Sequence, residues 1–148
     1  MRIAFDTEFI EDGITIDLVS IGMIREDGKT YYAETAEADY TKASDWVKEH
    51  VFPNLTGRAK DRQTIAAEII EFAGPEPEFW AWYADYDWVA LCQLYGRMID
   101  LPKGWPMYCR DFKQTVDMAG WKTFPSPDSH NALEDAVWLA GEMDRLNG

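Results

Sequence analysis

The chain opens with a short apolar run that ends in two acidic residues, Ile3-Ala4-Phe5-Asp6-Thr7-Glu8, and this run predicts a β-strand. Successive side chains of a strand point to opposite faces, so Asp6 and Glu8 share one face while Ile3, Phe5 and Thr7 share the other. Two carboxylates side by side on one strand repel each other unless a cation lies between them. Because the other face of this strand is apolar, the pair suggests a metal site beside a buried sheet.

Short turns after this strand predict two more strands. Asp12-Gly13 separates the first strand from an apolar run at residues 14–24. Residues 26–29, Glu-Asp-Gly-Lys, are typical of a hairpin turn and lead into residues 30–34. We therefore expect three consecutive strands to pair as an antiparallel meander.

The apolar spacing then changes to three and four, which predicts helices with short strands between them. Asp61 is a candidate N-cap for a helix that carries Ile65, Ile69 and Phe72 on one stripe, and Gly74 follows its end. The other predicted elements are helices at 43–51, 85–95, 111–119 and 131–146 and strands at 78–83 and 107–110. Strands that alternate with helices after a meander indicate a mixed α/β sheet with helices packed on it.

Two of the predicted helices carry an aspartate among apolar residues. Asp135 lies three positions after Ala132 and four before Leu139, inside the apolar stripe of the last helix. Asp87 is placed similarly, because Ala90, Leu91 and Leu94 follow it at helical spacings.

A core-facing aspartate is costly unless it is paired or bound to a metal. The alternative is that Asp87 caps its helix and that Asp135 is a first-turn acid favoured by the helix dipole. Taken with Asp6 and Glu8, the two aspartates predict a cluster of four carboxylates at the sheet.

His130 is the candidate general base. It precedes Asp135 by five positions, which is about 140° around an ideal helix, so the two cannot share a helical face. His130 is therefore expected in the loop before a helix that Asn131 and Glu134 begin as an N-x-x-E pair. A loop histidine at the rim of a carboxylate cluster is well placed to accept a proton. His50, near a helix end, is interpreted as structural.

Composition favours one packed domain over residues 1–148, since 47% of the residues are hydrophobic. Asp6 and Glu8 interrupt the first apolar run, which argues against a signal peptide or a membrane span. Cys92 and Cys109 have no CxxC spacing and are expected to be reduced core thiols. These features indicate a cytoplasmic protein.

The net charge of −13 argues against a general nucleic-acid binder, which usually neutralises phosphates with Lys and Arg. The charge is uneven, however. Residues 88–126 hold five basic and three acidic residues, a net charge of +2, which leaves −15 for the rest of the chain. This local basic strip could guide a short polyanion, or it could be chance clustering on a solvated surface.

The acidic motifs resemble those of the DEDDh 3′-5′ exonucleases, a family of the ribonuclease-H-like superfamily that includes proofreading subunits, ribonuclease T and oligoribonuclease. Asp6-Thr7-Glu8 matches the family's DxE motif, Tyr86-Asp87 matches its aromatic-Asp pair, and His130 to Asp135 matches HxxxxD. The matches keep the family's order and span nearly the whole chain. The run FDTEFIEDG at residues 5–13 is most similar to compact bacterial 3′-5′ exoribonucleases best known from mycobacteria.

This resemblance implies a ribonuclease-H-like α/β fold whose mixed sheet has five strands, an antiparallel meander of three and two parallel strands. It implies a 3′-5′ exoribonuclease that releases nucleoside 5′-monophosphates from single-stranded or 3′-overhanging RNA. The subgroup also suggests a homodimer. RNA and DNA 3′ ends both remain candidate partners, because the preference depends on contacts with the 2′-hydroxyl group.

The resemblance also implies roles for the acidic residues and for His130. Asp6, Glu8, Asp87 and Asp135 would hold two divalent cations, with Asp6 bridging them. Ligand sets made only of oxygen favour Mg²⁺ or Mn²⁺ over zinc. One cation would activate water, the other would stabilise the leaving 3′-oxygen, and His130 would take the proton of the water.

The chain departs from the family pattern beside two of its motifs. Phe9-Ile10-Glu11 stands where the family often has Thr-Thr-Gly or Met-Thr-Gly, so contacts with the terminal nucleotide are not carried over. Tyr83 replaces a common Asn, and Asp85 is close enough to Asp87 that either could be the ligand. The candidates for stacking on bases, unless they belong to the core, are Phe9, Trp80, Trp82 and Tyr83.

Three rival interpretations remain. Residues 85–89, Asp-Tyr-Asp-Trp-Val, also fit the DxDx[TV] motif of haloacid-dehalogenase-type phosphatases, although that motif leaves Asp6, Glu8 and His130 unexplained. Ribonuclease H itself uses a strand acid and a helix glutamate rather than DxE. A catalytically silent domain could instead bind protein partners through its acidic face.

Overall fold

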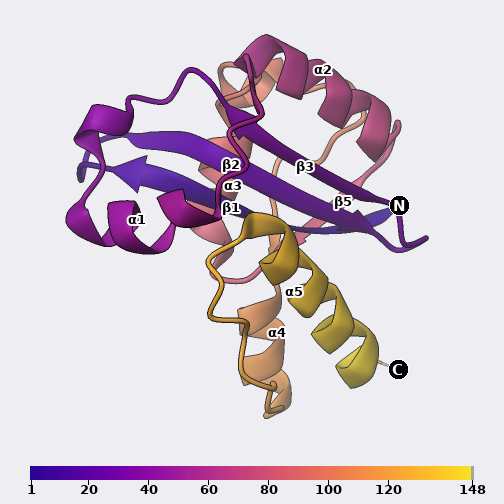
Figure 1. Ribbon diagram of the computed structural model, residues 1–148. Helices are drawn as coiled ribbons and strands as arrows, with labels where there is room; N and C mark the ends of the chain where they lie inside the picture. The colour runs from indigo at the N-terminus through magenta and orange to yellow at the C-terminus, as the bar shows by residue number, and fades with distance from the viewer. Residues whose placement is uncertain (148) are drawn as a thin grey trace.

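The computed structural model describes residues 1–147, in which helices flank one six-stranded mixed sheet (Figure 1). The strand order is β4-β3-β2-β1-β5-β6, which places β1 in the middle of the sheet. The strands are β1 (Arg2–Glu11), β2 (Ile16–Arg25), β3 (Thr30–Thr35), β4 (Ala59–Lys60), β5 (Glu78–Ala81) and β6 (Arg110–Asp111). The first three strands pair antiparallel, whereas β4 pairs parallel with β3, β5 with β1, and β6 with β5.

The meander is confirmed, but the sheet has six strands rather than the five expected. The extra strand, β4, has two residues, and a two-residue strand is too short to produce a periodic pattern. The strand expected at 107–110 also contracts to β6, because pairing with β5 is limited to Arg110 and Asp111. The strand β5 ends at Ala81 rather than at Tyr83, because the backbone of Tyr83, with a φ of +53°, turns the chain into α3 (Ala84–Cys92).

Five α-helices in the described residues match the predicted ones to within a few positions. Their bounds are α1 (Asp45–His50), α2 (Arg62–Ala73), α3 (Ala84–Cys92), α4 (Phe112–Ala119) and α5 (Ala132–Asn147). Ser44, Asp61 and Asp111 cap α1, α2 and α4 by accepting hydrogen bonds from backbone N–H groups. Asn131 does the same for α5, accepting from Leu133 and Glu134 at 3.0 Å each. No helix within residues 1–147 is long and apolar enough to span a membrane.

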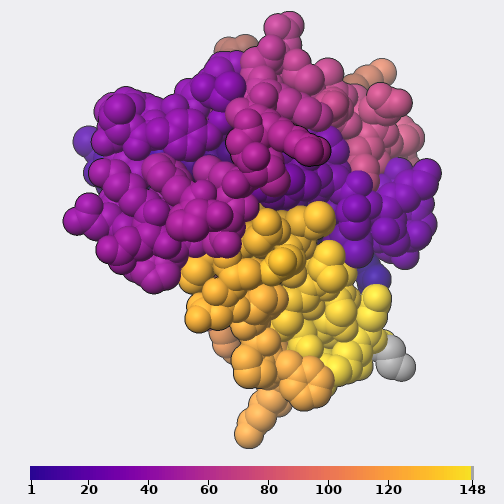
Figure 2. All heavy atoms as spheres, in the orientation of Figure 1, coloured from indigo at the N-terminus to yellow at the C-terminus, as the bar shows by residue number. Residues whose placement is uncertain are grey.

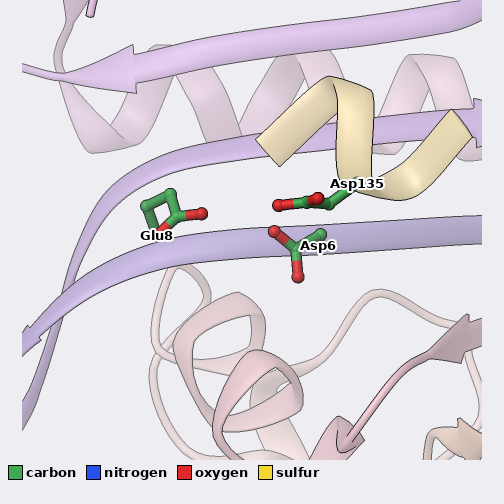
Figure 3. A group of neighbouring side chains, drawn as sticks. All are labelled: Asp6, Glu8 and Asp135. Atoms are coloured by element: carbon green, nitrogen blue, oxygen red, sulfur yellow. The ribbon is translucent and has the colours of Figure 1, made fainter. Parts of the chain in front are cut away.

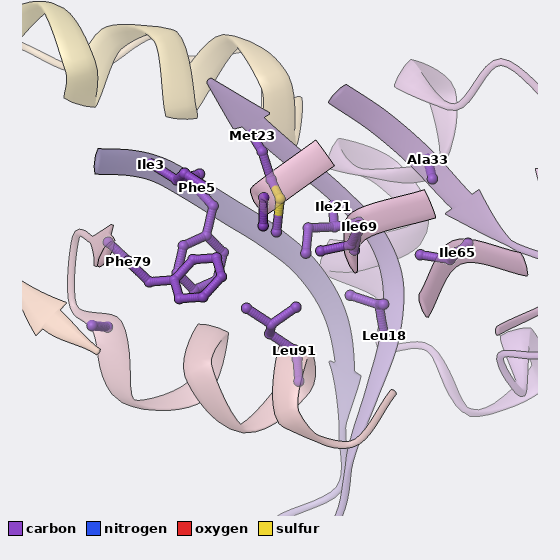
Figure 4. Packing of buried hydrophobic residues seen from close by; sticks show 14 of the residues in the cluster. Ile3, Phe5, Leu18, Ile21, Met23, Ala33, Ile65, Ile69, Phe79 and Leu91 are labelled. Carbon is purple, nitrogen blue, oxygen red and sulfur yellow. The ribbon is translucent and has the colours of Figure 1, made fainter. Parts of the chain in front are cut away.

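The two faces of the sheet bury different sets of side chains, and β1 contributes to both. On one face Ile3 and Phe5 pack with residues of α2 and α3, including Ile69 and Leu91 (Figure 4). On the other face Ala4 belongs to a second cluster with Phe112, Val116, Leu139 and Met143 of α4 and α5. The alternation along β1 therefore sends Asp6 and Glu8 toward α5 and Thr7 toward α3.

Gly22 sets how closely α5 approaches the sheet. It pairs with Asp6 across the β1–β2 ladder. A Cβ atom at Gly22 would lie 2.3 Å from the backbone nitrogen of Leu133 and 2.4 Å from the carbonyl carbon of Ala132, distances that no real Cβ atom tolerates. The first turn of α5 therefore rests directly on the sheet beside Asp6, which brings Asp135 to the same place.

Candidate active site

Three carboxylates from two elements meet where α5 begins. Asp6 and Glu8 project from β1, and Asp135 projects from the first turn of α5 toward them (Figure 3). Each of the three offers an oxygen that lies within 4.8 Å of those of the other two. The sequence prediction that Asp135 faces the strand acids is therefore met in the structure.

Asp87 reaches the same site from the opposite face of the sheet. Its side chain is buried in the first turn of α3, and its Oδ1 atom accepts hydrogen bonds from the backbone N–H of Thr7, at 3.0 Å, and from the Thr7 hydroxyl. Thr7 lies between Asp6 and Glu8 on β1. Asp85 is exposed, so the helix turns Asp87, and not Asp85, toward the strand.

Burial raises the pKa of every carboxyl group in this cluster, and the charges of neighbouring cluster acids add to the rise for Asp6, Glu8 and Asp87. The pKa of Asp6 lies well above its usual range because of burial first and then the charges of Asp87, Glu8 and Asp135. Burial, with Asp135 and Asp87, raises the pKa of Glu8 to about 8. Burial also raises the pKa of Asp135 to about 6, although His130 opposes that rise. Such a group of acids disfavours full ionisation unless positive charge is added.

The carboxylates line an open pocket of about 460 Å³ whose other walls are largely aromatic. The lining residues besides the four acids are Thr7, Phe9, Trp82, Tyr83, Asp85 and Tyr86. Phe9 and Tyr86 meet edge to face, with ring centroids 5.9 Å apart. Phe9, Trp82 and Tyr83, the aromatic residues selected from the sequence, thus all border the acidic cluster, whereas Trp80 packs on Phe112 in the core.

His130 is not one of the residues that line this pocket. It occupies the loop before α5, as expected, with a φ of +50°. Its Nε2 atom is 3.3 Å from Oδ1 of Asp128, and its ring meets that of Trp46 edge to face at 4.8 Å. His130 precedes Asp135 by five residues and opposes the rise in the pKa of Asp135, which fits a position near the edge of the cluster.

Several residues at or near the site were not selected from the sequence. Tyr86 has a sequence signal only as part of the aromatic-Asp pair, and Thr7 only as a residue on the apolar face of the first strand. Gly22 and Trp46 had no local signal, because their contacts join segments that are far apart in the sequence. His50, interpreted as structural, stacks on Trp46 with ring centroids 4.8 Å apart and lies 5.7 Å from the His130 ring.

The donor set fits a hard divalent cation. All four side chains offer carboxylate oxygens, and Mg²⁺, Mn²⁺ and Ca²⁺ prefer oxygen ligands. The raised pKa values give a second reason, since a cation between these oxygens would relieve the repulsion that raises them.

Comparison with known proteins agrees with this geometry. Residues 1–145 match the family model of the 3′-5′ exoribonuclease Rv2179c-like domain. The 3′-5′ exoribonuclease Rv2179c of Mycobacterium tuberculosis strain H37Rv is 44% identical over 146 residues, which cover 92% of this chain and 87% of the relative. The 3′-5′ exoribonuclease MT2234.1 of strain CDC 1551 matches with the same identity and coverage.

A solved structure supports the fold assignment. The crystal structure of E. coli exonuclease I in complex with a dT13 oligonucleotide superposes with a TM-score of 0.70 at 13% sequence identity. The superposition covers 99% of this chain but only 42% of the exonuclease I chain. The ribonuclease-H-like architecture expected from the sequence is therefore present, and this chain corresponds to less than half of exonuclease I.

Proposed function

The chain belongs to the family of Rv2179c-like 3′-5′ exoribonucleases, and on that basis we propose that it hydrolyses RNA from the 3′ end and releases nucleoside 5′-monophosphates. The observation that carries the proposal is the convergence of Asp6, Glu8 and Asp135, with Asp87 behind Thr7, in one pocket. Residues 1–148 act as one exonuclease domain in this proposal, and the substrate is single-stranded RNA or a 3′ overhang.

We propose that the four carboxylates would hold two divalent cations, Mg²⁺ or Mn²⁺. Asp6 lies within 4.8 Å of Glu8 and Asp135 and directly precedes Thr7, whose N–H donates to Asp87, so it is next to the other three acids. When bound, the cations would supply a nucleophile at neutral pH and neutralise charge on the scissile phosphate. The protein's own contribution is to keep these acids close together in a half-buried site, which full ionisation would otherwise oppose.

His130 is proposed as the general base, a role that its place at the rim of the cluster supports. A base must be neutral to accept a proton, and the imidazole group of histidine can both gain and lose a proton near physiological pH. His130→Ala should lower kcat by roughly 10²- to 10⁴-fold, the usual scale for a lost general base. Metal and substrate binding should survive, because His130 is not among the proposed ligands. Wild-type turnover in this variant would rule out the base role and leave only Asp135 of the HxxxxD motif.

The aromatic walls are proposed to hold the terminal bases. Phe9, Trp82 and Tyr83 border the acidic cluster, and Tyr83 and Tyr86 are both exposed to solvent. Bases stack on aromatic faces without strong sequence preference, by about 1–3 kcal/mol per base. This arrangement suits an enzyme that removes each nucleotide in turn, whatever its base.

Digestion of 5′-labelled oligomers would test the substrate and the direction together. Single-stranded and overhanging RNA and DNA are incubated with Mg²⁺, Mn²⁺ or EDTA. We expect a descending ladder on RNA that requires metal and that a 3′-phosphate blocks. Preference for DNA would change the substrate, cleavage of a closed circle would indicate an endonuclease, and full activity in EDTA would exclude the metal site.

A further inference from the structure

The segment from α1 to Asn54 lies against the loop that carries His130. In Figure 2 the violet surface of this segment adjoins the orange start of α5. Trp46 is the main side chain of this contact, since its ring stacks on His50 at an interplanar angle of 19° and meets His130 at 75°. One side of the His130 ring is thus bordered by two aromatic rings from α1.

Asn54 fixes the backbone next to His130. Its Nδ2 atom donates hydrogen bonds to the carbonyl oxygen of Ser129, at 2.5 Å, and to that of His50, at 2.8 Å. One amide group therefore joins the end of α1 to the residue immediately before His130. The Ser129 hydroxyl oxygen is itself buried and has no hydrogen-bond partner among the described residues.

The backbone of His130 needs such support. A φ of +50° is the left-handed region, which residues other than glycine adopt at a cost in free energy. Such a conformation persists where the surrounding structure holds it. The loop before His130 contains Pro125 and Pro127 and forms no helix or strand, and Asn54 and Trp46 contact its last two residues, Ser129 and His130.

We propose that Asn54 and Trp46 are positioning residues that hold His130 at the rim of the carboxylate cluster. Asn54 fixes the carbonyl group before His130, and Trp46 limits the directions that the imidazole ring can take. This inference rests on the proposed role of His130 as the base. A base displaced by about 1 Å can cost roughly 10²-fold in rate, so loss of either contact should lower kcat more than it changes KM.

A merely structural role would give a different result. Trp46 is 51% exposed and lies outside the buried clusters formed by the described residues, so its removal should change the melting temperature little. Trp46→Phe keeps a ring in the same place and should recover most of the turnover that Trp46→Ala loses. Glu49→Ala, at an exposed position of the same helix, is the matched control and should leave kcat unchanged.

A double-mutant cycle with His130→Ala tests the coupling. In the wild-type background we expect Asn54→Ala and Trp46→Ala each to lower kcat by about 10- to 100-fold, with Mg²⁺ affinity and KM nearly unchanged. In the His130→Ala background the same substitutions should cause almost no further loss. Equal losses in both backgrounds, or wild-type kcat in both single variants, would overturn the positioning role. If His130→Ala alone keeps full turnover, the general-base assignment fails instead, and the cycle thus separates the two failures.

Discussion

Thr7 connects the two halves of the carboxylate cluster at the scale of a single residue. Because side chains alternate along β1, Thr7 points away from Asp6 and Glu8 and toward α3. Its N–H and hydroxyl groups both donate to Oδ1 of Asp87, and it is 4% exposed. These two hydrogen bonds lower the pKa of Asp87, against the burial that raises it. Thr7 therefore orients Asp87 and favours its ionised form.

Thr7→Val should weaken metal binding while preserving the fold. Valine keeps the shape of threonine and the backbone hydrogen bond but removes the hydroxyl donor, and lost support of a ligand typically costs 10- to 100-fold in metal affinity or activity. Mn²⁺ affinity measured by calorimetry, together with kcat, checks this expectation. Thr7→Ser restores the donor and should recover most of the loss. Equal affinity in all three proteins would show that the hydroxyl does not support the site.

At this scale the sequence predicted the positions of the acidic residues better than the contacts that surround them. The strand period placed Asp6 and Glu8 together, and the apolar stripe of the last helix placed Asp135 beside them. The choice between Asp85 and Asp87 needed the observed phase of α3, whose first turn begins after the left-handed Tyr83. The contacts of His130 with Trp46 and of Ser129 with Asn54 could not be predicted, because they join a loop to a segment about 80 residues earlier and follow no periodic pattern.

At the scale of elements, the site depends on how closely α5 lies on β2. Gly22 is buried in the middle of the meander, and its missing side chain is replaced by the backbone of Ala132 and Leu133. A glycine in a strand often marks such a close approach. The same contact places the N-terminal turn of α5, with Asp135, over Asp6, so the spacing between two elements determines the spacing between these two carboxylates.

Gly22→Ala should therefore damage the site more than a typical surface substitution would. The new methyl group would meet backbone atoms at 2.3–2.4 Å, so α5 must shift, and overpacking of this kind typically costs about 1–3 kcal/mol. We expect a lower melting temperature together with a larger fractional loss of metal affinity and kcat. Gly141→Ala, in α5 with nothing within 4 Å of the added atom, is the control and should be neutral or stabilising. Unchanged metal affinity in Gly22→Ala would show that the spacing of α5 does not matter.

The length of an element determines how well its own residues predict it. The meander and α2 have enough residues for an alternating or helical pattern to emerge, and α2 also has both its cap and its terminal glycine. The two-residue strands β4 and β6 exist because neighbouring strands offer them hydrogen-bond partners, not because of their own residues. Strand number therefore depended on tertiary structure.

At the scale of the whole molecule, an acidic protein of net charge −13 gathers several carboxyl groups in one half-buried cluster. This arrangement has a stability consequence. Carboxyl groups whose pKa is higher in the folded than in the unfolded protein bind protons more tightly when folded. Their contribution to stability is complete below the unfolded pKa and is lost as pH rises through the folded pKa.

For this cluster the loss should occur between about pH 5 and pH 8. Burial raises the pKa of Asp135 to about 6 and that of Glu8 to about 8, so these groups ionise in that interval. Glu34 does not interfere, because hydrogen bonds from Thr56 and Tyr32 outweigh its burial and lower its pKa. The melting temperature of the metal-free protein in EDTA should therefore fall as pH rises from 5 to 8.

Divalent cations should reverse this fall, and more strongly at pH 8 than at pH 5, because ionised carboxylates bind metal and protonated ones do not. Mn²⁺ or Mg²⁺ at 100 times the dissociation constant stabilises a protein by about 2.7 kcal/mol, or roughly 5–10 °C for a chain of this size. Differential scanning fluorimetry across this range, with and without metal, checks both effects. Glu8→Gln removes one of the titrating acids and should flatten the pH dependence in EDTA. A melting temperature that rises with pH in EDTA, or an identical slope in Glu8→Gln, would show that the cluster is not the source of the effect.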